Sequence, residues 1–100
     1  MFLLAITHPT TGALAYQVSK QALEAFTASA ALELAPWVRV NAVAPGAVLA
    51  PEHPCGKEEA GGFPTGNRPQ PEEIADAVLF LLRSPGIDGQ TLFVDGGQHL

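Results

Sequence analysis

Residues 33–48 read ELAPWVRVNAVAPGAV, and they join the end of a helix to a strand and a tight turn. Pro36 cannot continue a helix, because proline lacks the backbone N–H and its ring clashes with the preceding turn. The residues at 37–44 are rich in valine and alternate in part, which favours a strand. Pro45 and Gly46 favour a turn at the carboxyl end of that strand. The segment therefore predicts a helix followed by a strand that enters the core.

Helices are expected on both sides of this strand. The alanine-rich residues 14–34 predict one long helix that the proline stops. PEEIADAVLFLLRS, at 71–84, predicts a second, because Pro71 suits the first helical position and the acids after it suit the positive end of the helix dipole. Four apolar residues of this helix share one stripe that we expect to face the core: Ile74, Ala77, Val78 and Leu81.

Two further strands complete the pattern. FLLAIT, at 2–7, is short, apolar and without a helical period, and QTLFVD, at 90–95, precedes a pair of glycines. Residues 49–70 contain many prolines and glycines and predict one long loop, a kind of segment that often covers a site. The order is βαβαβ, which indicates an α/β fold with a parallel sheet and right-handed crossovers.

This framework is incomplete as a domain. Three strands and two helices cannot cover both faces of a parallel sheet, although such sheets are normally buried on both sides. No G-x-G-x-x-G turn lies between a strand and a helix. We therefore expect residues 1–100 to be the C-terminal part of a Rossmann-type doubly wound domain, without the N-terminal half that would bind dinucleotide phosphates.

The composition excludes several classes of protein. Ten Asp and Glu stand against five Lys and Arg, whereas nucleic-acid binders carry clustered positive charge. The single cysteine, Cys55, forms no internal disulfide and suits a reducing compartment. No apolar run is long enough for a membrane span, and MFLLAI lacks the basic leader and cleavage site of a signal peptide. We expect a cytoplasmic protein that binds neither nucleic acid nor membrane.

The segment AYQVSK, at 15–20, places Tyr16 and Lys20 on one face of the first helix. A phenol is a weak acid at neutral pH, and a nearby ammonium stabilises its phenolate, so such a pair can exchange a proton with a substrate. The same spacing also fits a core-edge tyrosine beside a solvated lysine. Spacing alone leaves both interpretations open, because Y-x-x-x-K occurs in many helices by chance.

The residues around this pair resemble the short-chain dehydrogenase/reductase family. The likeness runs through AYQVSKQALEAFTASAALELAPWVRVNAVAPGAV, at 15–48, and continues in PEEIADAVLFLL, at 71–82, and GQTLFVDGG, at 89–97. Within the family, ELAPWVRVNAVAPGAVLAPE is most similar to bacterial pteridine reductases. The resemblance implies hydride transfer from a nicotinamide dinucleotide to a carbonyl or imine, here of a dihydropterin or dihydrofolate type. It favours NADP over NAD, although the residue that separates the two follows a strand that this sequence does not contain.

The resemblance also implies roles for individual residues. Tyr16 would donate the proton, and Lys20 would assist it and hold the nicotinamide ribose. Pro45, Gly46, Ala47 and Val48 would line the nicotinamide. A threonine common in the family is replaced by Ala50, which removes a hydroxyl contact to the pyrophosphate.

The family's serine has no clear counterpart. Counting back from the tyrosine leads to Leu3 or Leu4, inside the first strand. Thr7, at the strand end, is a candidate substitute for it, and the alternatives are a turn threonine that bonds its own backbone or residues missing from this sequence. His8, His53 and Cys55 match no zinc spacing, so we expect no metal site.

Two classes of function follow. In the first, this chain is the catalytic half of an NAD(P)-dependent oxidoreductase and is inactive alone. In the second, it is a truncated or degenerate relative that acts as a non-catalytic binding module. The helix at 14–34 is small and apolar on more than one side, so we expect it either to pair subunits in a homo-oligomer, a dimer or a tetramer, or to meet the missing half of the domain.

Overall fold

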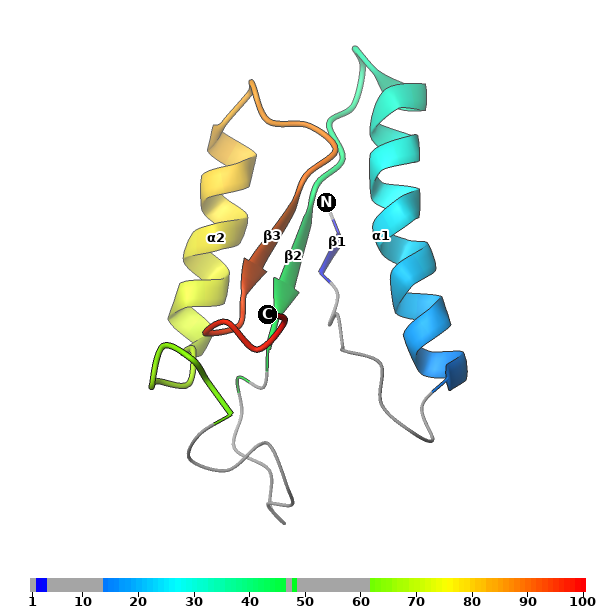
Figure 1. The fold of residues 1–100 in the computed structure, drawn as a ribbon. Helices are drawn as coiled ribbons and strands as arrows, with labels where there is room; N and C mark the ends of the chain where they lie inside the picture. The colour runs from blue at the N-terminus through cyan, green and yellow to red at the C-terminus, as the bar shows by residue number, and fades with distance from the viewer. Residues whose placement is uncertain (1, 4–13, 47, 49–61) are drawn as a thin grey trace.

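The computed structural model describes residues 2–3, 14–46, 48 and 62–100 (Figure 1). The predicted βαβαβ order is present in this part of the chain. Its elements are β1 (Phe2–Leu3), α1 (Leu14–Leu34), β2 (Ala42–Pro45), α2 (Pro71–Arg83) and β3 (Thr91–Val94). Within the described residues, no helix is both long and apolar enough to cross a membrane.

The three strands form one parallel sheet in the order β1-β2-β3. Phe2 pairs with Ala42 on one side of β2, and the four residues from Ala42 to Pro45 pair with Thr91 to Val94 on the other. Parallel pairing brings the carboxyl ends of β2 and β3 to the same edge of the sheet, which is also the edge near which α1 begins (Figure 1). The prediction of a parallel α/β sheet is confirmed.

The central strand β2 is buried on both faces. Ala42 and Ala44 pack with Leu23 of α1, whereas Val43 between them packs with Ala77 and Leu81 of α2. Because successive residues of a strand point to opposite faces, the two helices cover opposite sides of the sheet. The predicted α2 stripe is confirmed, and the other apolar residues that join its cluster are Ile74, Val78, Ile87, Leu92 and Val94.

Helix α2 begins as the sequence predicted. Pro71 occupies the start of the helix, and Gln70 precedes it in an extended conformation. Gln70 and Glu73 form a reciprocal capping box, in which the Gln70 backbone N–H donates to Glu73 Oε2 at 2.6 Å. These contacts satisfy N–H groups that a helix start otherwise leaves unpaired.

The predicted strand at 37–44 is wrong at its beginning. Regular pairing starts only at Ala42, and Trp37, which is 87% exposed, lies in the turn that follows α1. Side-chain hydrogen bonds hold the intervening residues instead, because Asp88 Oδ1 accepts from the backbone N–H of Val40 at 2.8 Å. Within β2 the expected alternation of faces holds, because Ala42 and Ala44 pack on one side and Val43 on the other. Of the predicted first strand at 2–7, residues 4–7 lie outside the described residues.

The Arg39 side chain links the residues that precede β2 to the carboxyl end of α2. Its guanidinium donates to the carbonyl oxygens of Leu81, Leu82, Ser84 and Ile87, each at 3.0 Å. The last carbonyls of a helix lack partners within the helix and carry partial negative charge, so a guanidinium satisfies both their hydrogen bonding and their charge.

The buried side chain of Asn41 links the residues that precede β2 to the loop between α2 and β3. It is 2% exposed, its Nδ2 donates to the carbonyl of Ile87 at 3.0 Å, and its Oδ1 accepts from the N–H of Gln90 at 3.0 Å. Both ends of the amide are thereby paired, as burial of a polar side chain requires. Arg39 and Asn41 together fix the approach of the chain to β3.

We predict that Arg39→Met lowers the free energy of unfolding of the intact protein by ~2–4 kcal/mol, since the variant leaves partly buried carbonyls without their charged donor. Urea denaturation measures this change through the transition midpoint. Arg83→Met, at an exposed position of α2, is the matched control and should change the value by less than ~0.5 kcal/mol. Equal effects of the two substitutions would contradict the role given to Arg39.

Candidate active site

Tyr16 and Lys20 lie one turn apart near the beginning of α1. Tyr16 is 47% exposed, and Lys20 Nζ stands 5.3 Å from the centroid of its ring. At this distance the ammonium interacts with the face of the aromatic ring. The beginning of α1 lies toward the carboxyl edge of the sheet (Figure 1), where open α/β sheets bind ligands. The structure thus presents a phenol and an ammonium together at a solvent-accessible position.

The turn after β2 is built against the end of β3. The Gly46 N–H donates to the carbonyl of Val94 at 3.2 Å. A Cβ atom placed on Gly46 would lie 2.8 Å from Asp95 Cβ and 2.5 Å from Gln98 Oε1, closer than side-chain carbons normally approach. Glycine is therefore required here by the close approach of the two segments. Val48 is half-buried, and Ala47 lies outside the described residues.

A tight turn at residues 95–99 follows β3, and Asp95 organises it. Asp95 is 5% exposed and accepts hydrogen bonds from the N–H of Gly97 at 2.9 Å and of His99 at 3.0 Å. Its Oδ2 also lies 2.8 Å from His99 Nδ1. Gly96 and Gly97 adopt φ angles of 64° and 88°, which favour glycine over other residues.

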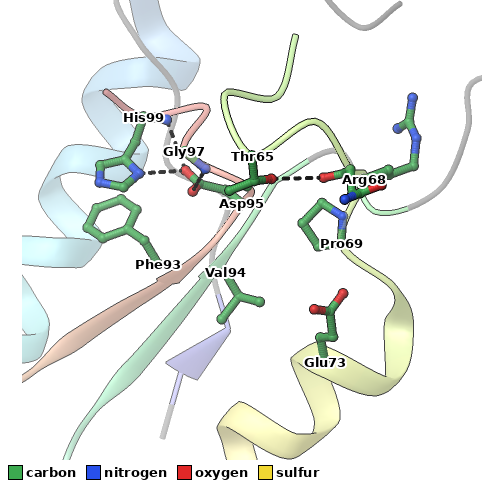
Figure 2. A pocket seen from close by; sticks show the side chains of 11 residues that line it. Thr65, Arg68, Pro69, Glu73, Phe93, Val94, Asp95, Gly97 and His99 are labelled. Atoms are coloured by element: carbon green, nitrogen blue, oxygen red, sulfur yellow. Dashed lines mark hydrogen bonds and ion pairs between the residues drawn. The ribbon is translucent and has the colours of Figure 1, made fainter. Parts of the chain in front are cut away.

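A pocket of about 450 Å³ opens beside this turn (Figure 2). It lies between the 95–99 turn, the end of β3 and the segment that leads into α2. Its lining residues are Thr65, Asn67, Arg68, Pro69, Glu73, Phe93, Val94, Asp95, Gly96, Gly97 and His99. Neither Tyr16 nor Lys20 lines it, so the pocket is separate from the Tyr16–Lys20 pair.

The structure brings together some of the predicted site residues and leaves others undescribed. Tyr16 and Lys20 are adjacent on α1, and Pro45 and Gly46 form the end of β2 and its turn. Thr7 lies outside the described residues, as do His8, His53 and Cys55. No cluster of metal-ligating side chains occurs among the residues that the structure describes.

Sequence reasoning missed Asp95 and His99 as members of this region. An acid directly after an apolar strand and before two glycines, in VDGGQH at 94–99, was the available signal. A carboxylate at such a position accepts backbone N–H groups of the following turn.

Comparisons with known proteins agree on the family of this chain. The family model described as enoyl-(acyl carrier protein) reductase matches residues 3–99. Carbonyl reductase family member 4 of Danio rerio is 47% identical over 92 residues, which cover 89% of this chain and 39% of that protein. Dihydromonapterin reductase of Escherichia coli is 38% identical over 90 residues, covering 87% of this chain and 38% of that protein.

Solved structures give the same result. An apo SCOR enzyme from Clostridium thermocellum matches with a TM-score of 0.82 and 33% identity, over 98% of this chain and 41% of that one. FolM alternative dihydrofolate reductase 1 from Brucella canis, complexed with NADP, matches with a TM-score of 0.80 and 30% identity, over 98% of this chain and 42% of that one. The chain thus spans about two fifths of the length of these relatives. With the βαβαβ sheet and the Tyr16–Lys20 pair already described, these matches show that the chain belongs to the short-chain dehydrogenase/reductase family.

Proposed function

We propose that the parent protein of this chain is an NAD(P)H-dependent oxidoreductase that reduces a carbonyl or imine substrate. The observation that carries the proposal is the contact between Tyr16 and Lys20 near the carboxyl edge of the sheet, in a member of this family. The chain covers about two fifths of its relatives, so the activity is proposed for the parent protein. The 100-residue chain alone is proposed to be inactive.

The residues at this edge suit a nicotinamide dinucleotide. Gly46 has no side chain, so a planar ring can approach the backbone of the Pro45–Gly46 turn closely. The Lys20 ammonium is a donor for ribose hydroxyl groups. When bound, the dinucleotide supplies the hydride. Brucella canis FolM is complexed with NADP, which supports NADP over NAD here.

The chain's own residues supply the proton. Tyr16 Oη donates its proton to the substrate oxygen or nitrogen as the neighbouring carbon is reduced. The Lys20 ammonium, held beside the phenol ring, stabilises the negative charge that remains on the phenolate oxygen. Ala47 and Val48 are proposed to complete the lining of the nicotinamide site, and Thr7 is proposed to polarise the substrate in place of the family's serine.

A dihydropterin or dihydrofolate type of substrate is proposed first. It is supported by the similarity to dihydromonapterin reductase and to FolM alternative dihydrofolate reductase. A ketone or aldehyde is the second candidate, supported by the similarity to carbonyl reductase family member 4. Competition between a dihydropterin and a simple ketone in one assay distinguishes the two by their values of kcat/KM.

A non-catalytic binding module is the alternative function, and a parent protein that oxidises no NADPH with either type of substrate would favour it. The parent protein is expected to be cytoplasmic and to bind neither nucleic acid nor membrane, in keeping with the acidic composition of the chain.

We further propose that α1 pairs subunits in a homo-oligomer. Leu14, Val18 and Leu32 are 76%, 58% and 82% exposed, and their spacing, with Ala25, places them on the helix face away from the sheet. An exposed apolar stripe with small residues at its centre fits closely against a second helix. A dimer or tetramer built on this face would remove the stripe from water.

Ala25→Glu in the parent protein should therefore lower the mass of the assembly, because it places a charge at the centre of the proposed contact. Light scattering coupled to size exclusion measures that mass. Ala75→Glu, the same change at an exposed position of α2, is the control and should leave the mass unchanged. An unchanged oligomer in Ala25→Glu would rule out this face.

Tyr16→Phe in the parent protein should lower kcat by at least ~10²-fold, because the ring remains while its proton donor is lost. Its dissociation constant for NADPH should stay close to that of the wild type. Lys20→Met should weaken both turnover and NADPH binding, since the ammonium serves the phenol and the ribose. Steady-state oxidation of NADPH and fluorescence titration provide the two measurements.

Ser19→Ala is the matched control for these variants, because Ser19 lies on the same turn and its hydroxyl donates to the backbone carbonyl of Tyr16 at 2.6 Å. It should keep nearly the full rate. If Tyr16→Phe retained more than about a tenth of the wild-type rate, the assignment of the proton donor would be wrong.

A further inference from the structure

We propose that Asp95 is a positioning residue for the nicotinamide site, although it does not belong to the Tyr16–Lys20 pair. Its carboxylate holds the 95–99 turn in one conformation next to Pro45 and Gly46. The position of this turn sets the position of Pro45 and Gly46, against which the nicotinamide is proposed to bind. This inference rests on the proposed dinucleotide-dependent function.

The 95–99 turn is built around one carboxylate, that of Asp95. The oxygens of Asp95 accept from the N–H groups of Gly97 and His99 and lie within hydrogen-bond distance of His99 Nδ1 (Figure 2). The group is 5% exposed, so the free energy of its burial depends on these donors. A neutral side chain at this position cannot satisfy all of them in the same way, and the turn would relax.

His99 ties the end of the turn back to β3. Its ring stacks on that of Phe93, with the centroids 3.9 Å apart and the planes at 17° (Figure 2). The Asp95 carboxylate holds the same ring at its Nδ1 edge. The imidazole is therefore fixed both at its face and at its edge, which restrains the whole 95–99 turn.

The 95–99 turn is in direct contact with Gly46. A Cβ atom on Gly46 would stand 2.8 Å from Asp95 Cβ and 2.9 Å from Asp95 Cα. The hydrogen bond from the Gly46 N–H to the carbonyl of Val94, the residue before Asp95, closes the contact. No space remains between the two backbones, so a displacement of Asp95 must be transmitted to the turn at Pro45 and Gly46.

The same turn also supports the segment that enters α2. The N–H of Thr65 donates to the carbonyl of Gly96 at 3.0 Å, and a Cβ on Gly96 would lie 2.9 Å from Phe63 Cδ1. Phe63 is buried. Loss of the Asp95 carboxylate should therefore increase the mobility of the chain in two places, at Pro45 and Gly46 and in the loop that leads into α2.

The experiment uses Asp95→Asn in the intact parent protein. The amide keeps the size of the side chain but presents an NH₂ group where an oxygen accepted hydrogen bonds. We expect the dissociation constant for NADPH to rise about tenfold, which corresponds to ~1.4 kcal/mol. We expect kcat at saturating NADPH to fall by less than about threefold, because Asp95 does not touch the reacting atoms.

Asp88→Asn is the matched control. Asp88 also accepts a backbone hydrogen bond, from the N–H of Val40, at the end of β3 remote from the site. The control should lower the stability of the protein without changing its affinity for NADPH. An unchanged NADPH affinity in Asp95→Asn, or an equal loss in both variants, would overturn the positioning role.

A second readout separates this inference from the proposed function. Hydrogen exchange of the Gly46 amide should be faster in Asp95→Asn than in Asp88→Asn, whether or not the protein binds NADPH. If wild-type protein failed to bind NADPH, the proposed function would fail, and this exchange measurement would still decide the structural claim. Equal exchange rates in the two variants would refute it.

Discussion

Burial of β2 on both faces is the constraint on which the rest of this structure depends. Ala42, Val43 and Ala44 are at most 1% exposed, and their alternation sends two side chains toward α1 and one toward α2. A strand enclosed in this way needs a helix on each side and a paired strand at each edge. The small residues at 42 and 44 let α1 approach closely, whereas Val43 joins the larger cluster under α2.

The two ends of the sheet serve different purposes because parallel pairing aligns them. At the amino end, Arg39, Asn41 and Asp88 use polar side chains to hold loops and the end of α2. At the carboxyl end, backbone atoms approach each other closely around Gly46 and Asp95. Helix α1, whose first turns contain Tyr16 and Lys20, also begins toward this edge (Figure 1). The first end contributes to stability, and the second contains the groups suited to chemistry.

Local patterns were enough to predict the helices. Both helices were predicted closely, with a proline two residues beyond the end of α1 and another at the start of α2, and the adjacency of Tyr16 and Lys20 follows from their spacing of four. The beginning of β2 was not predictable in this way. Arg39 donates hydrogen bonds to residues more than forty positions away in the sequence. The later start of the strand, at 42 rather than 37, therefore depends on tertiary contacts that a local pattern does not reveal. Asp95 forms its hydrogen bonds with residues close to it in the sequence, so a local pattern could have indicated them. Its contact with Gly46 joins residues far apart in the sequence, so a local pattern could not.

The most direct test of this account is a crystal structure of the intact parent protein with bound NADPH. We expect Lys20 Nζ at ~3 Å from the hydroxyl groups of the nicotinamide ribose. We also expect the nicotinamide ring to lie against Pro45 and Gly46, with Tyr16 Oη facing the space beside that ring in which the substrate oxygen or nitrogen would bind. A dinucleotide bound elsewhere, with Tyr16 and Lys20 making no contact with it, would contradict the central claim.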